Sequence, residues 1–160
     1  MFFLTNLTKE LSLLPQDLGI DIRELISKKI RELEGNVIGD HGYIVAIVKF
    51  ERSGTGTVEN DTGNVNFKIA YEAITYKPIK GEIIKAIPFF VNDHGFFCNV
   101  GPLQIFVSKH MMGENWEYID EVWKNEDETI DIDIPIKLQI MATRINSNEI
   151  TALGKLLNSK

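Results

Sequence analysis

The amino-acid sequence predicts an α+β protein built from two small domains, the first mixed and the second all-β. Three observations lead to this prediction. In the first 80 residues, one stretch repeats its apolar side chains at helical spacing, and extended segments flank it. The last 80 residues hold five short strand-like runs and no helical stripe. Between the halves, "YKPIKGE" at 76–82 supplies a proline and a glycine, so we expect the domains to be residues 1–80 and 81–160.

The first half begins with an extended segment, residues 2–14, and continues with a helix expected over 21–34. Asp21 with Glu24 three residues later is typical of a capping box, and Gly35 stands where a helix would end. The apolar residues on one helical face are Ile22, Leu25, Ile26, Ile30 and Leu33.

Two long strands complete the first half, and we expect them at 43–51 and 65–76. The connector "RSGTGTVENDTGN" at 52–64 predicts turns with a short strand at 57–59. It does not fit the phosphate-binding GxGxxG pattern, and no helix follows it. The strand at 65–76 carries apolar residues on both faces, so both should be covered. We expect the helix to cover one face and a partner protein to cover part of the other.

The second half predicts five short strands separated by glycine, proline and asparagine turns. Five strands in about 80 residues is the count of an OB barrel. The acidic run "KNEDETIDID" at 124–133 is expected to be a solvated loop. The strands are expected at 82–91, 95–100, 104–108, 135–145 and 149–154.

An Asp-His-Gly-aromatic cassette occurs twice, at 40–43 and 93–96. It could be a catalytic dyad, half of a metal site or a turn. A catalytic dyad would need a nucleophile or a third group that orients the histidine, and the sequence near the cassettes offers neither. Glycine supplies the positive φ of a tight turn before a strand, so we expect a turn in both copies and neither a catalytic nor a metal site. The residues that could bind zinc are His41, His94, Cys98 and His110. Their positions lack the short paired spacings of zinc sites.

Charge is uneven along the chain. Residues 1–80 carry 10 Lys and Arg against 11 Asp and Glu, and residues 81–160 carry 7 against 12, which gives −1 and −5. Proteins that hold nucleic acid mainly through its phosphates are normally basic, so any RNA binding is expected to be weak. No apolar stretch approaches the roughly 18–20 residues that span a bilayer, and the lone cysteine excludes an internal disulfide.

Motifs from both halves, taken in order, resemble one family. "MFF", "HGYIVAIVKF", "YKPIKGE", "HGFFCNVGPLQIFVSKHMM" and "ITALG" occur in this order in the seventh-largest subunit of eukaryotic RNA polymerase II, a stalk-subunit family that also has archaeal relatives. The run from "GEIIKAIPFF" to "VSKHMM" is similar to the opening of an OB fold of the ribosomal-protein-S-one type. The resemblance implies a truncated ribonucleoprotein-like domain that docks on the polymerase, followed by an OB domain that binds RNA.

The resemblance also implies a role in the nucleus, as a non-catalytic stalk subunit in transcription that forms a heterodimer with the fourth-largest subunit. Such a subunit docks on the core through the largest subunit and a small common subunit, contacts single-stranded transcript weakly, and needs no cofactor, metal or membrane. A free-standing OB-fold RNA-binding factor of translation or RNA decay is the alternative. A small hydrolase is a further alternative, but it would need a pocket where several titratable groups converge, and the sequence indicates no such set of residues.

Three sets of residues match the family's functional positions. The RNA-binding set is His94, Phe97, Phe106, Lys109 and Arg144. The core-docking set is Pro15, Gln16, Asp17, Leu18, Gly19, Gly56 and Gly63. The partner-subunit set is Tyr71, Tyr76, Lys77 and Pro78. By strand parity, Phe96 and Phe97 cannot both face the barrel core.

Overall fold

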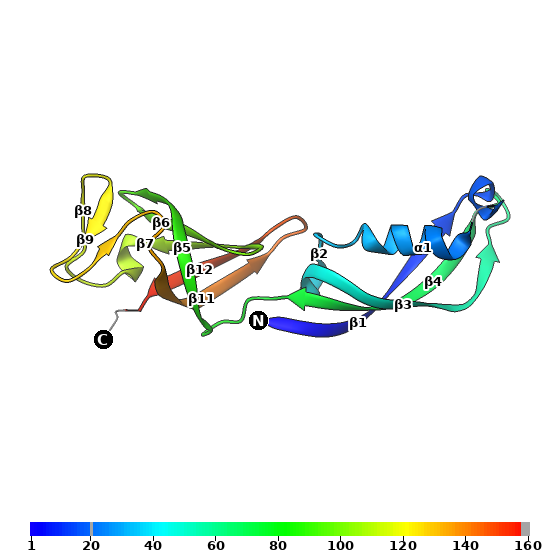
Figure 1. Cartoon of the computed structure of the whole chain (residues 1–160), viewed down its shortest axis with the longest axis horizontal. Coiled ribbons are helices and arrows are strands. Elements are labelled where there is room, and N and C mark those ends of the chain that lie inside the picture. Colours follow the sequence, from blue (N-terminus) through cyan, green and yellow to red (C-terminus); the bar gives the residue numbers. More distant parts are fainter. Residues whose placement is uncertain (20, 158–160) are drawn as a thin grey trace. The chain divides into compact units, whose positions relative to one another are not determined.

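The computed structural model describes residues 1–19 and 21–157, which form two compact units (Figure 1). One unit is Phe2–Lys77, and the other begins at Pro78 and includes Met1. The described residues contain one α-helix and are otherwise mostly strands. The predicted order of a mixed unit and an all-β barrel is found, and with one helix the structure is mostly β, so the α+β class is not confirmed.

The first unit is a four-stranded antiparallel sheet with one helix on one face (Figure 1). The strand order is β1-β4-β3-β2. A core forms between the helix and the sheet, and its fully buried side chains include Leu13, Ile30 and Ile69. The elements are β1 (Phe2–Leu13), η1 (Pro15–Gly19), α1 (Ile22–Arg31), β2 (Val37–Ile38), η2 (Gly39–His41), β3 (Gly42–Val58) and β4 (Val65–Tyr76).

Helix α1 starts where the sequence predicted and ends earlier. The Asp21 side chain accepts a hydrogen bond from the backbone N–H of Arg23 at 3.0 Å, which satisfies one of the free donors of the first turn. The predicted capping box is half formed, since no bond from Glu24 back to Asp21 occurs among the described residues. The helix ends at Arg31 because a hydrogen-bonded turn follows it and leads to Gly35, whose φ is +86°.

Strand β3 is longer than the sequence predicted. It runs unbroken from Gly42 to Val58, and three register shifts against β4 absorb its extra residues. The glycine-rich stretch is therefore strand, and only 59–64 form the turn. Gly56 lies within this strand, where an added Cβ would approach the Phe67 ring to 2.6 Å. Glycine at 56 lets the strand pass over that ring.

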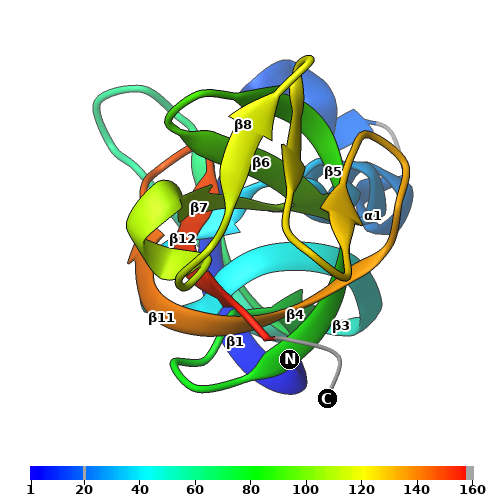
Figure 2. The same ribbon diagram turned by 90° about the vertical axis from the view of Figure 1, so that its left-hand side faces the viewer.

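The second unit is a closed five-stranded barrel, compatible with an OB fold (Figure 2). The strand order is β11-β12-β7-β6-β5, and β12 pairs with β7 in parallel. Alternate residues such as Phe96, Ile105 and Ile140 point inward and are fully buried. The elements are β5 (Ile83–Asn92), β6 (Gly95–Val100), β7 (Leu103–Ser108), η3 (Lys109–Met111), β11 (Ile136–Ile145) and β12 (Ile150–Leu156).

A small sheet is inserted between β7 and β11, where the sequence predicted only a solvated loop. It consists of β8 (Glu117–Ile119), β9 (Val122–Lys124) and β10 (Thr129–Ile130) (Figure 2). Trp123 is fully buried, and its indole N–H donates to the carbonyl of Asn92 at 2.9 Å. This buried ring packs against Tyr118 of β8 and bonds to β5, and the acidic residues on either side hide it in the sequence.

Both Asp-His-Gly cassettes are turns, as predicted. Gly42 and Gly95 have φ of +83° and +153°. A Cβ at these glycines would run into the backbone carbonyl oxygens of Tyr76 and Val107 on the neighbouring strands. The glycine of each cassette therefore lies where two strand backbones approach too closely for any side chain.

No helix among the described residues has the length and apolar character needed to cross a membrane.

Candidate nucleic-acid interface

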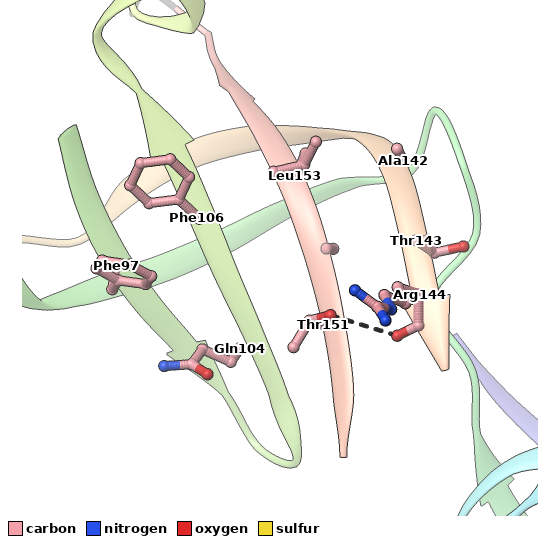
Figure 3. Close-up of a pocket in the computed structure, with 9 residues that line it drawn as sticks. Phe97, Gln104, Phe106, Ala142, Thr143, Arg144, Thr151 and Leu153 are labelled. Atoms are coloured by element: carbon pink, nitrogen blue, oxygen red, sulfur yellow. Dashed lines mark hydrogen bonds between the residues drawn. The ribbon is translucent and has the colours of Figure 1, made fainter. Parts of the chain in front are cut away.

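Phe97 and Phe106 lie side by side on the outer face of the barrel. They face each other across β6 and β7, and their ring centroids are 4.6 Å apart with the planes tilted by 36°. Phe96, one residue earlier, is fully buried inside the barrel. The alternation predicted from the sequence therefore holds, and it places two aromatic rings at the surface (Figure 3).

Two further phenylalanines extend this aromatic face. Phe89 and Phe90 on β5 are 44% and 51% exposed, and their rings lie 6.4 and 6.2 Å from that of Phe97. Adjacent strand residues normally point to opposite faces, but a register shift between Pro88 and Phe90 turns both rings outward. Sequence reasoning missed these two residues. The only signal was the adjacent pair of aromatics before the second cassette.

A groove of about 400 Å³ opens beside Phe106 on the same face (Figure 3). One end is apolar and includes Leu153, while the other end gathers Gln104, Thr151 and Arg144. These three polar residues are brought together by strand pairing, because Thr151 is opposite Gln104 on one side and opposite Arg144 on the other. The residues lining the groove are Phe97, Gln104, Phe106, Ala142, Thr143, Arg144, Thr151, Ala152 and Leu153.

The other two predicted RNA-binding residues lie at the opposite end of the β6–β7 hairpin. The backbone N–H of Lys109 donates to the carbonyl of His94 at 2.9 Å. The Lys109 ammonium lies 5.8 Å from the centroid of the Trp123 ring, and the His94 ring is 2.6 Å from the Asp93 carboxylate. The structure thus brings three of the five predicted residues to the groove, and it places His94 and Lys109 elsewhere.

Charge in the second half is segregated. Residues 113–135, which include the inserted sheet, hold nine acidic residues and one lysine, a net of −8. The rest of 81–160 holds six basic and three acidic residues, a net of +3, and the two parts sum to −5. The barrel strands are therefore mildly basic, which removes the electrostatic objection that the overall charge raised against RNA.

The predicted docking residues gather at one end of the first unit, and Gly56 lies near this end within β3, beside Val65 and Phe67. Gly63 has φ of +70°, and a Cβ there would lie 3.4 Å from the Pro15 side chain, so η1 and the β3–β4 turn are neighbours. Within η1, Leu18 packs against the core, while Gln16 and Gly19 are exposed. Asp17 closes the turn through its backbone N–H, which donates to the carbonyl of Leu14 at 2.9 Å.

The predicted partner-contact residues are mostly covered by this chain. Tyr71 and Tyr76 are each 4% exposed, Pro78 is buried and Lys77 is half-buried. Tyr71 lies on the α1 face of the sheet, where burial raises the pKa of its hydroxyl. Tyr76 meets Phe2 edge-to-face at 5.0 Å.

The sheet face opposite α1 carries exposed apolar residues. Phe2 and Leu4 are 63% and 64% exposed, and they pair with Tyr76 and Ile74 on β4. The one α-helix of the described residues lies on the other face, and the Phe2 ring and the Leu4 methyl groups at this end of the sheet meet solvent, while Tyr76 beside them is buried. An exposed cluster of this kind is typical of a protein-contact surface.

Reactive groups are few on these surfaces. Cys98 is fully buried in the barrel, and burial raises the pKa of its thiol to about 12, so it stays protonated at neutral pH. No cluster of three or more His, Cys, Asp or Glu residues that could hold a metal ion is present in the described parts of the chain.

Fold and site define a class: a mostly β protein of two units, with a sheet-and-helix unit before a barrel that carries an exposed aromatic face. Comparisons with known proteins narrow this class. Residues 8–63 match the SHS2 domain found in the N terminus of Rpb7p/Rpc25p/MJ0397.

Three relatives align with nearly the whole chain. The "DNA-directed RNA polymerase II subunit RPB7" of Glycine max is 35% identical over 98% of this chain and 92% of that protein. The Schizosaccharomyces pombe subunit rpb7 is 30% identical, with coverages of 97% and 94%. The Saccharomyces cerevisiae RPB7 is 26% identical, with coverages of 98% and 95%. The chain therefore belongs to the family of RNA polymerase II subunit 7.

Proposed function

We propose that this chain is a non-catalytic stalk subunit of DNA-directed RNA polymerase II and acts in transcription in the nucleus. The observation that carries the proposal is the length of the similarity. It spans 98% of this chain and 92% of the soybean subunit, and so covers the sheet unit as well as the barrel. A free-standing OB-fold factor would have no need of the matched N-terminal domain.

In this proposal residues 1–80 dock on the core polymerase, and residues 81–160 form an OB barrel of the ribosomal-protein-S-one type that contacts transcript. The four outward-facing phenylalanines, of which Phe89 and Phe90 are exposed and Phe97 and Phe106 half-buried, support the second role, because any base can stack on an aromatic ring for about 1–3 kcal/mol. Weak contact suffices for a polymerase subunit, since the transcript is already tethered and its effective concentration is high.

Core docking is assigned to the end of the sheet unit where η1 meets the β3–β4 turn. Pro15 and Gly63 are neighbours there, and the exposed Gln16 and Gly19 flank them. Loops that extend from a rigid scaffold are frequent binding sites. The contacts would be made with the largest subunit and a small common subunit.

The heterodimer partner is the fourth-largest subunit. Two units of about 80 residues each bury only about 60–65% of their unfolded surface, so each is marginal alone. Exposed Phe2 and Leu4 give a partner apolar surface to cover. Lys77 and Pro78, which follow β4, are the adjoining contact positions. Tyr76 packs beside Phe2 on this face, whereas Tyr71 lies on the α1 face and would act only through the sheet.

Native purification tests the proposal. A tagged copy of the chain, expressed in its own cells and recovered under mild conditions, should elute with the fourth-largest subunit and with core subunits of RNA polymerase II. Nuclear fractions should hold most of it. Recovery of the chain alone, or with ribosomal or RNA-decay proteins, would contradict the proposal.

A further inference from the structure

The groove beside Phe106 depends on the small side chain of one alanine. Ala142 lines it on the outer face of the barrel and has no side chain beyond Cβ to fill the space between the flanking residues. A register shift between Ile140 and Ala142 sets Ala142 opposite Leu153. The resulting volume of about 400 Å³ is within the range of small-ligand sites, and the groove remains open to solvent on the barrel surface.

Phe106 forms a wall of this groove. It lies between Phe97 on β6 and Leu153 on β12, because Phe97 and Phe106 are paired across one strand boundary and Phe106 and Leu153 across the next. One side of the Phe106 ring is therefore taken by Phe97, and the side toward Leu153 faces the groove (Figure 3). A flat aromatic ligand fits against that side.

The polar end of the groove offers unused hydrogen-bonding groups. The Gln104 amide and the Arg144 guanidinium have no hydrogen-bond partner among residues 1–19 and 21–157. The Thr151 hydroxyl donates to the carbonyl of Arg144 in a long bond of 3.5 Å, which leaves its oxygen able to accept. The polar end of the groove thus presents the Gln104 amide as donor and acceptor, the Thr151 oxygen as acceptor and the Arg144 guanidinium as a cation.

We propose that this groove is a one-nucleotide subsite that reads the edge of an adenine base. The base stacks on Phe106, the Gln104 amide bonds its edge in the bidentate pattern that glutamine makes with adenine, and Arg144 holds the adjoining phosphate. The inference rests on the proposed contact with transcript, and it adds a base preference at one position of an otherwise sequence-tolerant face.

Binding of labelled oligo(A), oligo(U) and oligo(C) of equal length to the full chain with its co-expressed partner tests the subsite. We expect oligo(A) to bind about fivefold more tightly than oligo(U), at the lower end of what a bidentate pair contributes in an open groove. Adenine also stacks better, so the decisive quantity is the change of this ratio in variants. Gln104→Ala should reduce the ratio, and Gln104→Glu, which only accepts, should shift the preference toward cytosine.

Two further variants separate the base preference from the electrostatic contribution to RNA affinity. Arg144→Ala should weaken all three strands equally and lower the slope of log affinity against log salt by about one. Asn99→Ala removes an exposed amide beside Gln104 on β6, outside the groove, and should leave the ratio unchanged. Ratios that stay at the wild-type value in both Gln104 variants would overturn the adenine subsite while sequence-tolerant binding stands. If the wild-type complex binds none of the strands, the proposed transcript contact fails as well.

Discussion

The two Asp-His-Gly cassettes are explained by one atom, the Cβ that glycine lacks. In each copy the glycine follows a turn and passes against a carbonyl oxygen of the neighbouring strand, that of Tyr76 for Gly42 and that of Val107 for Gly95. The histidines are side chains of these turns, one in each compact unit. The motif occurs twice because the backbone makes the same close approach to a neighbouring strand in both places.

Replacing Gly95 with alanine should destabilise the barrel by at least about 2 kcal/mol, because the new Cβ adds steric overlap to the cost of an unfavourable φ. Gly101→Ala is the matched control. Its φ is +57° and no atom lies within 4 Å of the added Cβ, so only the backbone penalty of about 1 kcal/mol applies. Urea unfolding of both variants measures the difference. Equal losses would show that close approach is not the reason for glycine at 95.

The outward rings should carry RNA affinity without carrying stability. We expect the wild-type heterodimer to bind single strands with micromolar or weaker affinity, and Phe97→Ala plus Phe106→Ala to weaken binding at least about tenfold, since each stacked base contributes about 1–3 kcal/mol. Ile83→Ala removes an exposed apolar side chain from another part of the barrel and serves as control. Unchanged affinity in a correctly folded double variant would mean that this face binds protein instead.

At the scale of elements, η1 and the β3–β4 turn form one surface although they lie about 40 residues apart in sequence. Gly63→Gln places a bulky side chain against Pro15 and should weaken binding to the core polymerase, while the heterodimer stays intact. The control is Gly54→Gln, which carries a similar backbone penalty at φ +80° with open space around it. A pull-down of core polymerase measures both. If the two variants bind the core equally well, this end of the sheet is not the docking surface.

An indole hydrogen bond from Trp123 to Asn92 links the inserted sheet to the barrel. Trp123→Phe should cost about 1–3 kcal/mol, because the carbonyl of Asn92 loses its donor in a buried place. Hydrogen exchange should rise around Asn92 and in β8–β10 and stay unchanged in the first unit. Trp116→Phe removes the same atoms from a buried ring whose indole has no hydrogen bond within the described residues, and it should cost less. Equal effects of both variants would contradict an anchoring role for the Trp123 hydrogen bond.

For the whole molecule, two marginal units and an exposed apolar sheet face predict dependence on a partner. Expressed alone, the chain should be poorly soluble or self-associated, and co-expression with the fourth-largest subunit should yield a soluble one-to-one complex. Light scattering after size exclusion measures the mass. Phe2→Ser plus Leu4→Ser should reduce self-association and also weaken the heterodimer, because both use the same surface. A monomeric, cooperatively unfolding lone chain would argue against the proposal.

Local patterns predicted the parts of the fold that depend on neighbours in sequence. Helix α1 and its Asp21 cap follow from apolar spacing and a single side-chain bond, and the order of the barrel strands along the chain follows from turn residues. Strand β3 was predicted too short because its glycines resemble a loop, whereas they are tolerated within a strand whose register shifts. The inserted sheet was missed because acidic residues surround the two buried side chains that define it, Trp123 and Ile130.

The sequence by itself determined which side chains are available at the surface of the barrel. Alternation puts Phe97 outside once Phe96 is inside, and this needs no knowledge of other strands. Only the tertiary structure decided what these side chains form together. Gln104, Thr151 and Arg144 meet because β12 pairs with β7 on one side and with β11 on the other. The acidic charge is separated from the barrel strands because a separate three-stranded sheet and its flanking loops carry it. Register between distant strands is set by barrel closure, which no local pattern encodes.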